Sequence, residues 1–399
     1  MSAQIIAPAI PSRATATACG GMIAMAAALG IGRFVYTPIL PAMMSGLGLS
    51  KSAAGLIASA NFLGYLLGAL LAAWPNLPGT RRTWLLGSLA ISGLTTAAMG
   101  LTQAMPAFLL LRFIGGAASA IVLVYASAIV LEHVTGANRP ALSAVHFGGV
   151  GVGIAVSAVL VTALLQAGEQ WSALWWTSGL LSLAATVIVA ALLHDSPSSG
   201  APIHRAPTRA TNPALLRLIV AYGLFGFGYV ITATFLVAIV RGSPTIHALE
   251  PIIWVIFGLA AVPSVALWGR LASRLGLTTT FAIASVVEAI GVLASVAWPS
   301  APGAFLAAML VGGTFMGLTA LGLVRARALT SGDPRRTLAL MTGAFGLGQI
   351  VGPSYAGFTA EHLGSFAVPS ATAVSALLLA AFLVGAITET AAGDPAPPR

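Results

Sequence analysis

Charged residues are what this chain has least of. Only 7% of its 399 residues are charged, whereas 58% are hydrophobic, and the mean hydropathy is +0.97. An average soluble domain carries roughly 25% charged residues, and a folded surface with far fewer does not stay in water. The composition therefore excludes a soluble globular protein and a disordered chain, and it predicts a protein whose main solvent is lipid.

Cysteine is nearly absent, and the sequence also lacks metal-binding and nucleotide-binding motifs. The single cysteine, Cys19, has no partner for an internal disulfide. One cysteine and scattered histidines give no metal-ligand spacing, so we expect no metal. The sequence has no G-x-x-x-x-G-K-[ST] loop, which excludes ATP as a direct energy source for this chain and leaves no cofactor to predict.

Long apolar runs are what the chain has in abundance. A helix needs about 20 apolar residues to cross the hydrocarbon, and turns or charges divide the sequence into twelve such runs. Transmembrane strands would instead alternate in short segments, so we predict an all-α membrane protein with twelve transmembrane helices. The expected spans are 19–44, 52–74, 83–103, 106–130, 141–165, 172–193, 214–240, 251–269, 277–298, 303–324, 338–361 and 367–388.

The basic residues set the orientation and the division of the chain. A Pro/Ser/Arg-bearing stretch at 194–213 predicts a linker between two six-helix halves, 1–193 and 214–399. With the N-terminus inside, fourteen basic residues fall on the cytoplasmic side, and Lys51 and Arg241 alone fall outside. This bias predicts that both termini are cytoplasmic. It also explains the net charge of +9 without nucleic acid as a partner.

Small features recur between the two halves at an offset near 196. Gly30 and Gly32 recur as Gly226 and Gly228, and the pair Gly115–Gly116 recurs as Gly312–Gly313. Together with the matched order of helices and basic loops, these recurrences indicate a duplication. Two parallel six-helix repeats with a site between them near the midplane are typical of secondary transporters.

The residues also resemble a known family over essentially the whole chain, the major facilitator superfamily (MFS). The run from Arg112 to Gly116 is similar to that superfamily's R-x-x-x-G element. GIGRFVYTPILP (Gly30–Pro41), HFGGVGVGI (His146–Ile154) and GQIVGP (Gly348–Pro353) resemble its YbfB/YjiJ-like branch. The resemblance implies the MFS fold in a bacterial inner membrane, and it implies no particular substrate.

The superfamily has a charged gate in the cytoplasmic loop after the second helix of each half. Here the first copy, PNLPGTRR, keeps the basic pair Arg81 and Arg82 and lacks the acid; the second copy, GRLASRLG, keeps Arg270 and Arg274 and has Ser273 where the acid is expected. The resemblance therefore implies a cytoplasmic gate at these four arginines, without its charge latch.

Two arginines lie within the apolar runs and are the strongest candidates for a binding site. A central arginine costs from about +2.5 kcal/mol upwards in lipid, so Arg33 and Arg112 should face protein or a water-filled cavity. Arg33 either binds solute or bonds carbonyls that Pro38 and Pro41 leave without partners. Arg112 either binds solute, takes part in conformational switching or proton movement as the resemblance implies, or ties its helix to a neighbouring one. The offset pairs Arg33 with Tyr229 on opposite walls of the cavity. The full predicted substrate-binding set is Arg33, Tyr36, Asn61, Arg112, Tyr229 and Gln349.

Two titratable groups at membrane depth are the candidates for proton coupling. His146 either titrates near neutral pH or is a neutral bridge between helices. Glu288 is the one acid in the interior of a predicted span and either carries a proton or bonds a neighbouring helix. The resemblance places its helix outside the cavity, which argues against contact of Glu288 with solute.

We therefore predict a secondary transporter that is not an enzyme and that moves a small organic solute, with protons as the coupling partner, by alternating access. An anionic or carboxylate metabolite is favoured, and the alternative is an exporter of amphipathic drug-like compounds. An intramembrane enzyme and a non-transporting receptor are the other hypotheses: the first lacks convergent catalytic groups and the second lacks a signalling domain. We expect a monomer in the lipid bilayer.

Overall fold

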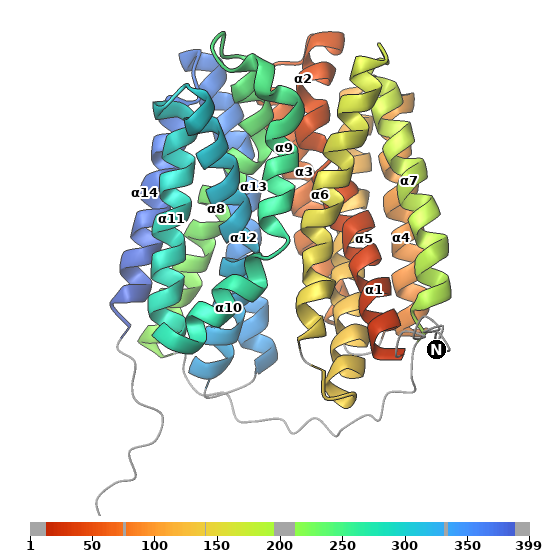
Figure 1. The fold of residues 1–399 in the computed structure, drawn as a ribbon, viewed down its shortest axis with the longest axis vertical. Helices are drawn as coiled ribbons and strands as arrows, with labels where there is room; N and C mark the ends of the chain where they lie inside the picture. Colours follow the sequence, from red (N-terminus) through yellow and green to blue (C-terminus); the bar gives the residue numbers. More distant parts are fainter. Residues whose placement is uncertain (1–12, 75–76, 140, 195–211, 331–333, 388–399) are drawn as a thin grey trace, which may run out of the picture.

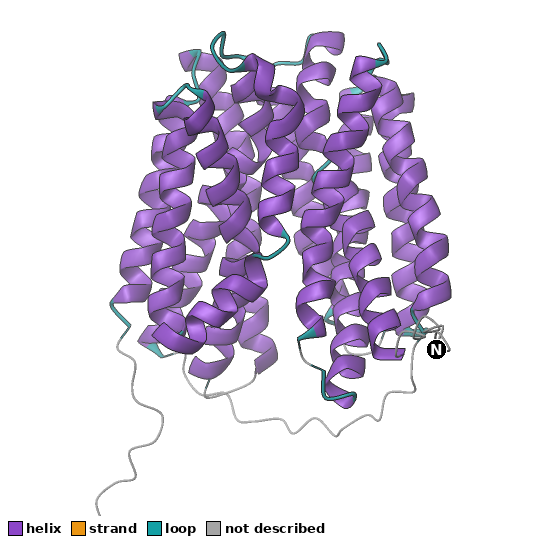
Figure 2. Ribbon diagram, viewed as in Figure 1, coloured by secondary structure: helices purple, strands orange, loops and turns teal. Residues whose placement is uncertain are grey.

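The computed structural model describes residues 13–74, 77–139, 141–194, 212–330 and 334–387. These residues form helices and short connections and contain no strand (Figure 2). The predicted linker falls almost entirely outside the described residues. The elements are α1 (Arg13–Met25), η1 (Ala26–Ile31), α2 (Tyr36–Leu47), α3 (Lys51–Ala72), α4 (Arg81–Ala98), η2 (Met99–Leu101), α5 (Met105–Gly136), α6 (Leu142–Gln166), α7 (Trp171–Leu192), α8 (Pro213–Arg241), η3 (His247–Leu249), α9 (Glu250–Ala261), α10 (Ser264–Leu275), α11 (Leu277–Ala297), α12 (Ala301–Leu329), α13 (Pro334–Leu363) and α14 (Ala367–Gly385).

The all-α prediction is confirmed, and twelve spans are consistent with the structure. Among the described residues ten helices are long and apolar enough to cross a membrane, with α1, η1 and α2 forming one of them, and the bent pair α9–α10 counts as an eleventh. α13 has 30 residues, but Gln349 and several glycines interrupt its apolar run, and it is not in that set. It nevertheless runs the length of the bundle beside α8 (Figure 1).

Two of the predicted spans differ from the structure because of proline. The expected straight helix over 19–44 is broken at residues 32–35, as described below. The span expected at 251–269 bends by 43° between α9 and α10 and continues to Leu275. Pro263 lies at this bend, and it has no N–H to continue the hydrogen-bond ladder of α9.

Local sequence explains where the helices begin. The side chains of Ser50, Thr80 and Asn212 accept hydrogen bonds from backbone N–H groups in the first turns of α3, α4 and α8, which supplies acceptors for N–H groups that have none within the helix. Proline occupies the first turn of α5, α8, α9 and α12, where its missing N–H costs nothing.

The helices gather into two groups of consecutive helices, α1–α7 and α8–α14 (Figure 1). Within each group glycines allow backbones to touch. A side chain on Gly64 or Gly68 of α3 would collide with carbonyls of α5, and one on Gly149 or Gly153 of α6 would collide with carbonyls of span one. Small residues at helix interfaces are how membrane helices approach closely.

The two groups contact each other mainly in the upper part of the molecule as drawn in Figure 1. From α3 to α13, the Lys51 N–H donates to Glu361 Oε2 (2.6 Å) and the Ser59 hydroxyl donates to the Ile350 carbonyl (2.6 Å). From α6 to α9, the Thr162 hydroxyl donates to the Pro251 carbonyl (3.0 Å).

A third pair of helices, α2 and α8, also joins the two groups. The Thr37 hydroxyl of α2 donates to the Ala233 carbonyl of α8 at 2.7 Å, and these residues are 196 positions apart. The predicted repeat offset therefore relates two residues that touch, as expected for residues beside an axis between two copies. The division into repeated halves at 193 and 214 stays a prediction.

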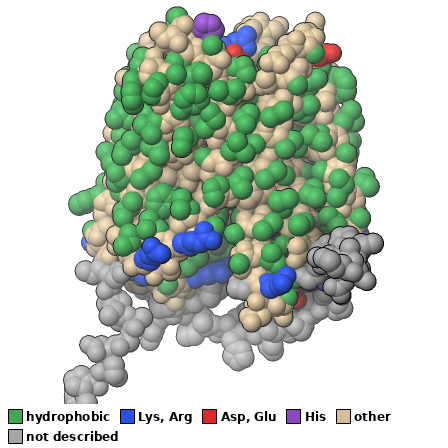
Figure 3. Space-filling view, in the orientation of Figure 1, with side chains coloured by type: hydrophobic (Ala, Val, Ile, Leu, Met, Phe, Trp, Pro, Cys, Tyr) green, Lys and Arg blue, Asp and Glu red, His purple; other side chains and the backbone are tan. Residues whose placement is uncertain are grey.

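The outer surface fits a bilayer. A broad belt of hydrophobic side chains covers the visible face, and arginines cluster along its lower rim, where the N-terminus of α1 also lies (Figure 3). Large hydrophobic side chains such as Leu110, Val187, Leu259 and Phe382 are more than half exposed. A soluble protein does not expose apolar patches of this size, so the chain is an integral membrane protein.

Candidate functional site

The break in the first span is the local feature that positions the site. η1 is a π-helix, and residues 32–35 after it are not regular helix. Here the Gly32 N–H bonds the Ala27 carbonyl (2.9 Å) and the Phe34 N–H bonds the Leu29 carbonyl (3.0 Å), each five residues back. Such π turns and prolines disturb the carbonyl register that follows. Because Pro38 and Pro41 lie directly above, the break at Arg33 is built into the sequence.

Arg112 of α5 bonds the carbonyls that this break frees. Its Nη1 donates to the Gly32 carbonyl and its Nη2 to the Arg33 carbonyl, both at 2.9 Å. Its guanidinium also lies 5.2 Å from the Tyr36 ring centroid and 5.8 Å from that of Trp175. The Gly32 and Arg33 carbonyls at the break are therefore bonded by Arg112. They differ from the Phe34 and Thr37 carbonyls, for which Pro38 and Pro41 supply no N–H.

Arg33 itself lies in a cage of aromatic rings and is 5% exposed, so it does not face lipid. Its guanidinium carbon is 4.2 Å from the ring centroid of Tyr65, 4.6 Å from that of Phe62 and 5.2 Å from that of Phe34. Its Nε and Nη2 have no hydrogen-bond partner among the described residues. The cage holds the cation through π faces and leaves two donors unused.

The opposite wall is formed by Tyr229 of α8 and Gln349 of α13. The Gln349 amide nitrogen bonds the Tyr229 hydroxyl, and the Gln349 Oε1 has no partner among the described residues. The Tyr229 ring stacks on those of Phe225, Phe315 and Phe345, with centroids 5.2–5.9 Å apart. This wall is neutral, aromatic and fully buried.

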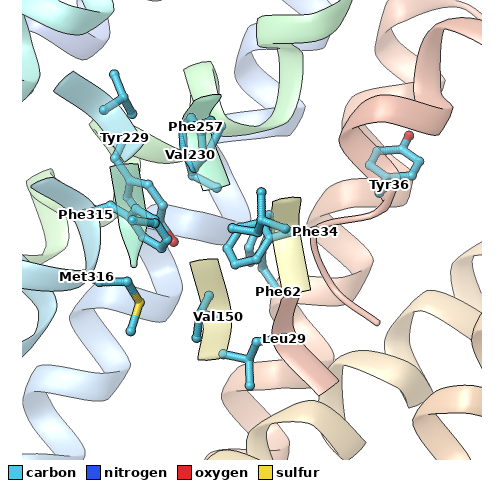
Figure 4. Packing of buried hydrophobic residues seen from close by; sticks show 14 of the residues in the cluster. Leu29, Phe34, Tyr36, Phe62, Val150, Tyr229, Val230, Phe257, Phe315 and Met316 are labelled. Atoms are coloured by element: carbon cyan, nitrogen blue, oxygen red, sulfur yellow. The ribbon is translucent and has the colours of Figure 1, made fainter. Parts of the chain in front are cut away.

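The two walls meet at Phe315 of α12. Its ring centroid is 5.8 Å from that of Phe34 and 5.7 Å from that of Tyr229, and Figure 4 shows Phe34 and Phe62 facing Tyr229 and Phe315. The structure thus brings Arg33, Tyr229 and Gln349 to one centre between the two groups of helices.

Tyr36 and Asn61, two further members of the predicted binding set, bond helices of the first group. The Tyr36 hydroxyl donates to the Ala54 carbonyl of α3 (2.8 Å), and the Asn61 amide donates to the Arg112 carbonyl of α5 (2.9 Å). Tyr36 also lies apart from the central rings in Figure 4. Among the buried side-chain nitrogen and oxygen atoms of Tyr36, Asn61 and Arg112, only the Asn61 Oδ1 and the Arg112 Nε have no hydrogen-bond partner among the described residues.

His146 lies inside the first group, among α1, α5 and α6. Its Nε2 is 3.0 Å from the Ser127 hydroxyl of α5, and its Nδ1 packs against Gly21 of α1. The side chain is fully buried. This geometry suits a histidine that bridges helices, and its role in proton coupling stays a prediction.

Glu288 is fully buried in the second group, where α11 packs against α12. Its Oε1 is 3.0 Å from the Thr314 hydroxyl, and its Oε2 has no partner among the described residues. The expectation that Glu288 does not touch solute, and its role in proton coupling, stay predictions.

The four predicted gate arginines lie at the lower ends of their helices. Arg81 forms an ion pair with Glu132 of α5 (2.8 Å), and Arg82 donates to the Ala190 and Leu193 carbonyls at the end of α7. Arg270 and Arg274 are exposed on α10. The described partners of the first pair lie within the first group, and a gate at these residues stays a prediction.

Sequence reasoning missed the aromatic cage. The predicted set lacks Phe34, Phe62, Tyr65 and Phe315, although Tyr65 lies one helical turn after Asn61 on a presumed cavity helix. Their relation to Arg33 is a tertiary contact, which spacing along one helix does not reveal. Among the described residues no group of three or more metal-ligating side chains comes together.

Comparison with known proteins identifies the family to which this chain belongs. Residues 25–385 match the protein family described as "Uncharacterised MFS-type transporter YbfB". The chain belongs to this family of MFS transporters. It is not an enzyme.

Relatives of this transporter share its length. A "Chloramphenicol resistance protein" of Streptomyces lividans is 26% identical over 386 residues, which cover 92% of this chain and 95% of that protein. Two solved structures are similar at 15% identity: a point mutant of the nucleoside transporter NupG (TM-score 0.72, 92% and 98% of the two chains), and a bacterial homologue of the human lysosomal transporter Spinster, inward-facing and occupied (TM-score 0.73, 94% and 97%). These two likenesses show the MFS fold alone.

Proposed function

We propose that this MFS transporter moves a small organic anion, with a carboxylate as the favoured group, between the two groups of helices. The observation that carries the proposal is Arg33. A buried cation without a counter-charge is costly, and Arg33 forms no ion pair with any described residue. A carboxylate fits the two unused donors of its guanidinium.

The second wall supports a solute that also has an apolar or aromatic body. Tyr229, Phe315 and Phe345 present ring faces around the centre, and the free Gln349 Oε1 accepts a hydrogen bond from a solute N–H or O–H. The polar contacts thus come from two elements of opposite groups, so a bound solute bridges them. Bridging by solute is what alternating access requires.

We place the protein in the bacterial inner membrane with both termini in the cytoplasm and the arginine-rich lower rim inside. The upper contacts Lys51–Glu361, Ser59–Ile350 and Thr162–Pro251 then close the outer side. These hydrogen bonds must break for the centre to open outward. Proton coupling completes the proposal, with His146 and Glu288, both fully buried, as the candidate groups.

A thermal-shift panel of matched acids and amides tests the anion directly. A solute that binds the folded protein raises its apparent stability, so we expect one or more carboxylates to raise the melting temperature and their uncharged amides to have no effect. Arg33→Ala and Tyr229→Ala should each erase the shift. A shift that is equal for acid and amide, or that survives both substitutions, contradicts the proposal.

The second candidate is an exporter of amphipathic drug-like compounds. The stacked rings of Phe225, Tyr229 and Phe345 favour it, as does the relative described as a chloramphenicol resistance protein. Chloramphenicol in the same panel separates the two. A shift with chloramphenicol that is unchanged in Arg33→Ala would favour this candidate.

A further inference from the structure

A cavity lies at the upper end of the boundary between the two groups of helices. Its volume is about 530 Å³, within the range of roughly 300–1,000 Å³ that holds drug-sized molecules. It is lined by α2 and α6 of the first group and by α8, η3 and α9 of the second, and α2, α6 and α9 reach the top of the molecule in Figure 1. The lining contains neither Arg33 nor Tyr229 nor Gln349, so this cavity is separate from the centre described above.

The buried part of the lining, which forms the floor of the cavity, is apolar. It consists of Pro38 of α2, Val161 of α6 and Val237 of α8. Pro38 follows Thr37, and Val237 lies one helical turn after Ala233, so the floor ends where the Thr37 hydroxyl bonds the Ala233 carbonyl between the groups (2.7 Å). A polar group without a partner is costly on such a surface, and the floor therefore suits the apolar body of a ligand.

The exposed part of the lining, which forms the rim, is polar. Gln166, Arg241 and His247 are exposed there, and Arg241 Nη1 pairs with Glu250 Oε1 at 3.3 Å, so the two charges of the rim neutralise each other. His247 Nδ1 is 3.0 Å from the Pro244 carbonyl. Because a carbonyl only accepts, Nδ1 carries the hydrogen, and Nε2 of the uncharged ring is an acceptor.

The rim thus offers hydrogen-bond donors and acceptors without net charge. Arg241 has further N–H groups besides the one that bonds Glu250, and the Gln166 amide both donates and accepts. These groups match an uncharged head that carries hydroxyls or an amide. A charged head would have to compete with one member of the existing ion pair.

The walls of the cavity belong to two bodies that must separate when the upper side opens. The Thr162 hydroxyl of α6 donates to the Pro251 carbonyl of α9 at 3.0 Å, and both residues line the cavity. Opening breaks this bond and moves the walls apart. A molecule that contacts both walls binds only while they are close, and it therefore favours the conformation in which the upper side is closed.

We propose that this cavity binds a small uncharged amphipathic molecule and that the bound molecule holds the upper side closed. Its apolar body lies on Pro38 and Val237, and its hydroxyl or amide head lies at Arg241 and His247. Such a molecule inhibits transport of any solute, because alternating access requires both sides to open in turn. The site does not depend on the anion proposed for the centre.

Thiol modification in lipid nanodiscs tests the site. Cys19→Ser removes the single cysteine, and Leu165→Cys then adds a thiol to the cavity wall. Leu164→Cys is the matched control, since Leu164 is also partly buried and does not line the cavity. The reagent is benzyl methanethiosulfonate, and the probe is phenyl β-glucoside, which has an aromatic body and an uncharged hydroxyl head. At about ten times its dissociation constant the probe should slow modification of Leu165→Cys about tenfold, because only empty cavities react, and leave Leu164→Cys unchanged.

Two analogues test the chemical class of the ligand. Glucose lacks the apolar body, and phenyl β-glucuronide carries a carboxylate on the same body, so both should protect Leu165→Cys less than the probe does. Gln166→Cys replaces Leu165→Cys if that variant does not fold. Absence of protection by phenyl β-glucoside overturns the site, and equal protection by the glucuronide overturns the uncharged class.

Hydrogen exchange tests the closure without depending on affinity. The benzyl group attached at Leu165→Cys fills the cavity by itself, so backbone amides at the upper ends of α6 and α9 should exchange several-fold more slowly than in the unmodified variant. The same adduct at Leu164→Cys should have no such effect. Unchanged or faster exchange in the Leu165→Cys adduct overturns the closure.

Discussion

The first spans of the two groups differ at positions that the predicted repeat relates to each other. Span one breaks at residues 32–35, whereas α8 is continuous from Pro213 to Arg241. The offset of 196 places Thr234 and Val237 of α8 at the positions of Pro38 and Pro41, so α8 keeps the N–H groups that span one lacks. One helix supplies a buried cation at a break, and the other supplies a tyrosine on an intact helix.

The same contrast extends to the helix that supports the break. The offset of 197 that relates Gly115 to Gly312 places Met309 at the position of Arg112. Met309 is largely exposed on α12, where no broken helix needs a donor. The comparison teaches that Arg112 belongs with the break: span one has free carbonyls and an arginine that bonds them, whereas α8 has neither.

Copying the prolines into α8 should give the largest effect. Thr234→Pro with Val237→Pro removes two hydrogen bonds of a buried helix, at about 3 kcal/mol or more each, and no arginine lies opposite to bond the freed carbonyls. We expect no folded protein, measured as loss of the monodisperse peak in size-exclusion chromatography. Thr234→Ala with Val237→Ala, the matched control, should keep it. A folded double-proline variant would mean that the break needs no partner.

Removing Arg112 should give the next largest effect. Arg112→Ala loses two charge-assisted hydrogen bonds, each worth roughly 1.5–3 kcal/mol, and leaves the Gly32 and Arg33 carbonyls unpaired. The melting temperature in detergent should fall sharply. Arg112→Lys should recover part of the loss because it keeps the charge without the fork.

Met309→Ala is the control for Arg112 in the second group, and it should change stability little because exposed positions rarely contribute. Equal effects at positions 112 and 309 would refute the link between the arginine and the break.

The neutral wall of the second group should contribute less to stability than the charged wall of the first. Tyr229→Phe removes one neutral hydrogen bond to Gln349 and should cost about 1 kcal/mol, a smaller fall in melting temperature than Arg112→Ala gives. Tyr355→Phe loses a hydroxyl contact to Thr372 near the surface and serves as the control. If Tyr229→Phe destabilised more than Arg112→Ala, the assignment of the two walls would be reversed.

Substitutions at the lower rims of the two groups should have the smallest effects on stability. Glu132→Gln breaks the ion pair with Arg81, whose side chains are 43% and 23% exposed, so the cost should lie within about 1 kcal/mol and shrink with added salt. Arg274→Gln on the exposed rim of α10 should change the melting temperature less still. If the loss of stability in Glu132→Gln did not depend on salt, the ion pair would not be a screened surface interaction.

Much of the fold could be predicted because lipid imposes strict rules on sequence. The apolar runs had to be helices, and the cost of a charge in lipid required Arg33 to be buried, which the structure confirms. The prolines at 38 and 41 indicated that carbonyls would lack partners. The boundaries were less predictable, since bends such as the one at Pro263 redirect a helix without ending its apolar run.

The pairing of side chains could not be predicted from the sequence. That Arg112 rather than Arg33 bonds the freed carbonyls depends on the distance between α5 and the break, which the sequence of neither helix contains. The cage of Phe62 and Tyr65 depends on how α3 is rotated, and the partner of Glu288 depends on which residue of α12 faces it. Such contacts are set by packing between helices far apart in the chain.

The central claim is that one solute is held by Arg33 from the first group and by Tyr229 from the second. A double-mutant cycle measures this directly, with the affinity of the best panel acid determined by isothermal titration for the wild type, Arg33→Gln, Tyr229→Phe and the double variant. We predict that Arg33→Gln weakens binding at least about tenfold, or ~1.4 kcal/mol, and that the second substitution costs less once the first is present. Unchanged affinity in Arg33→Gln would contradict the account.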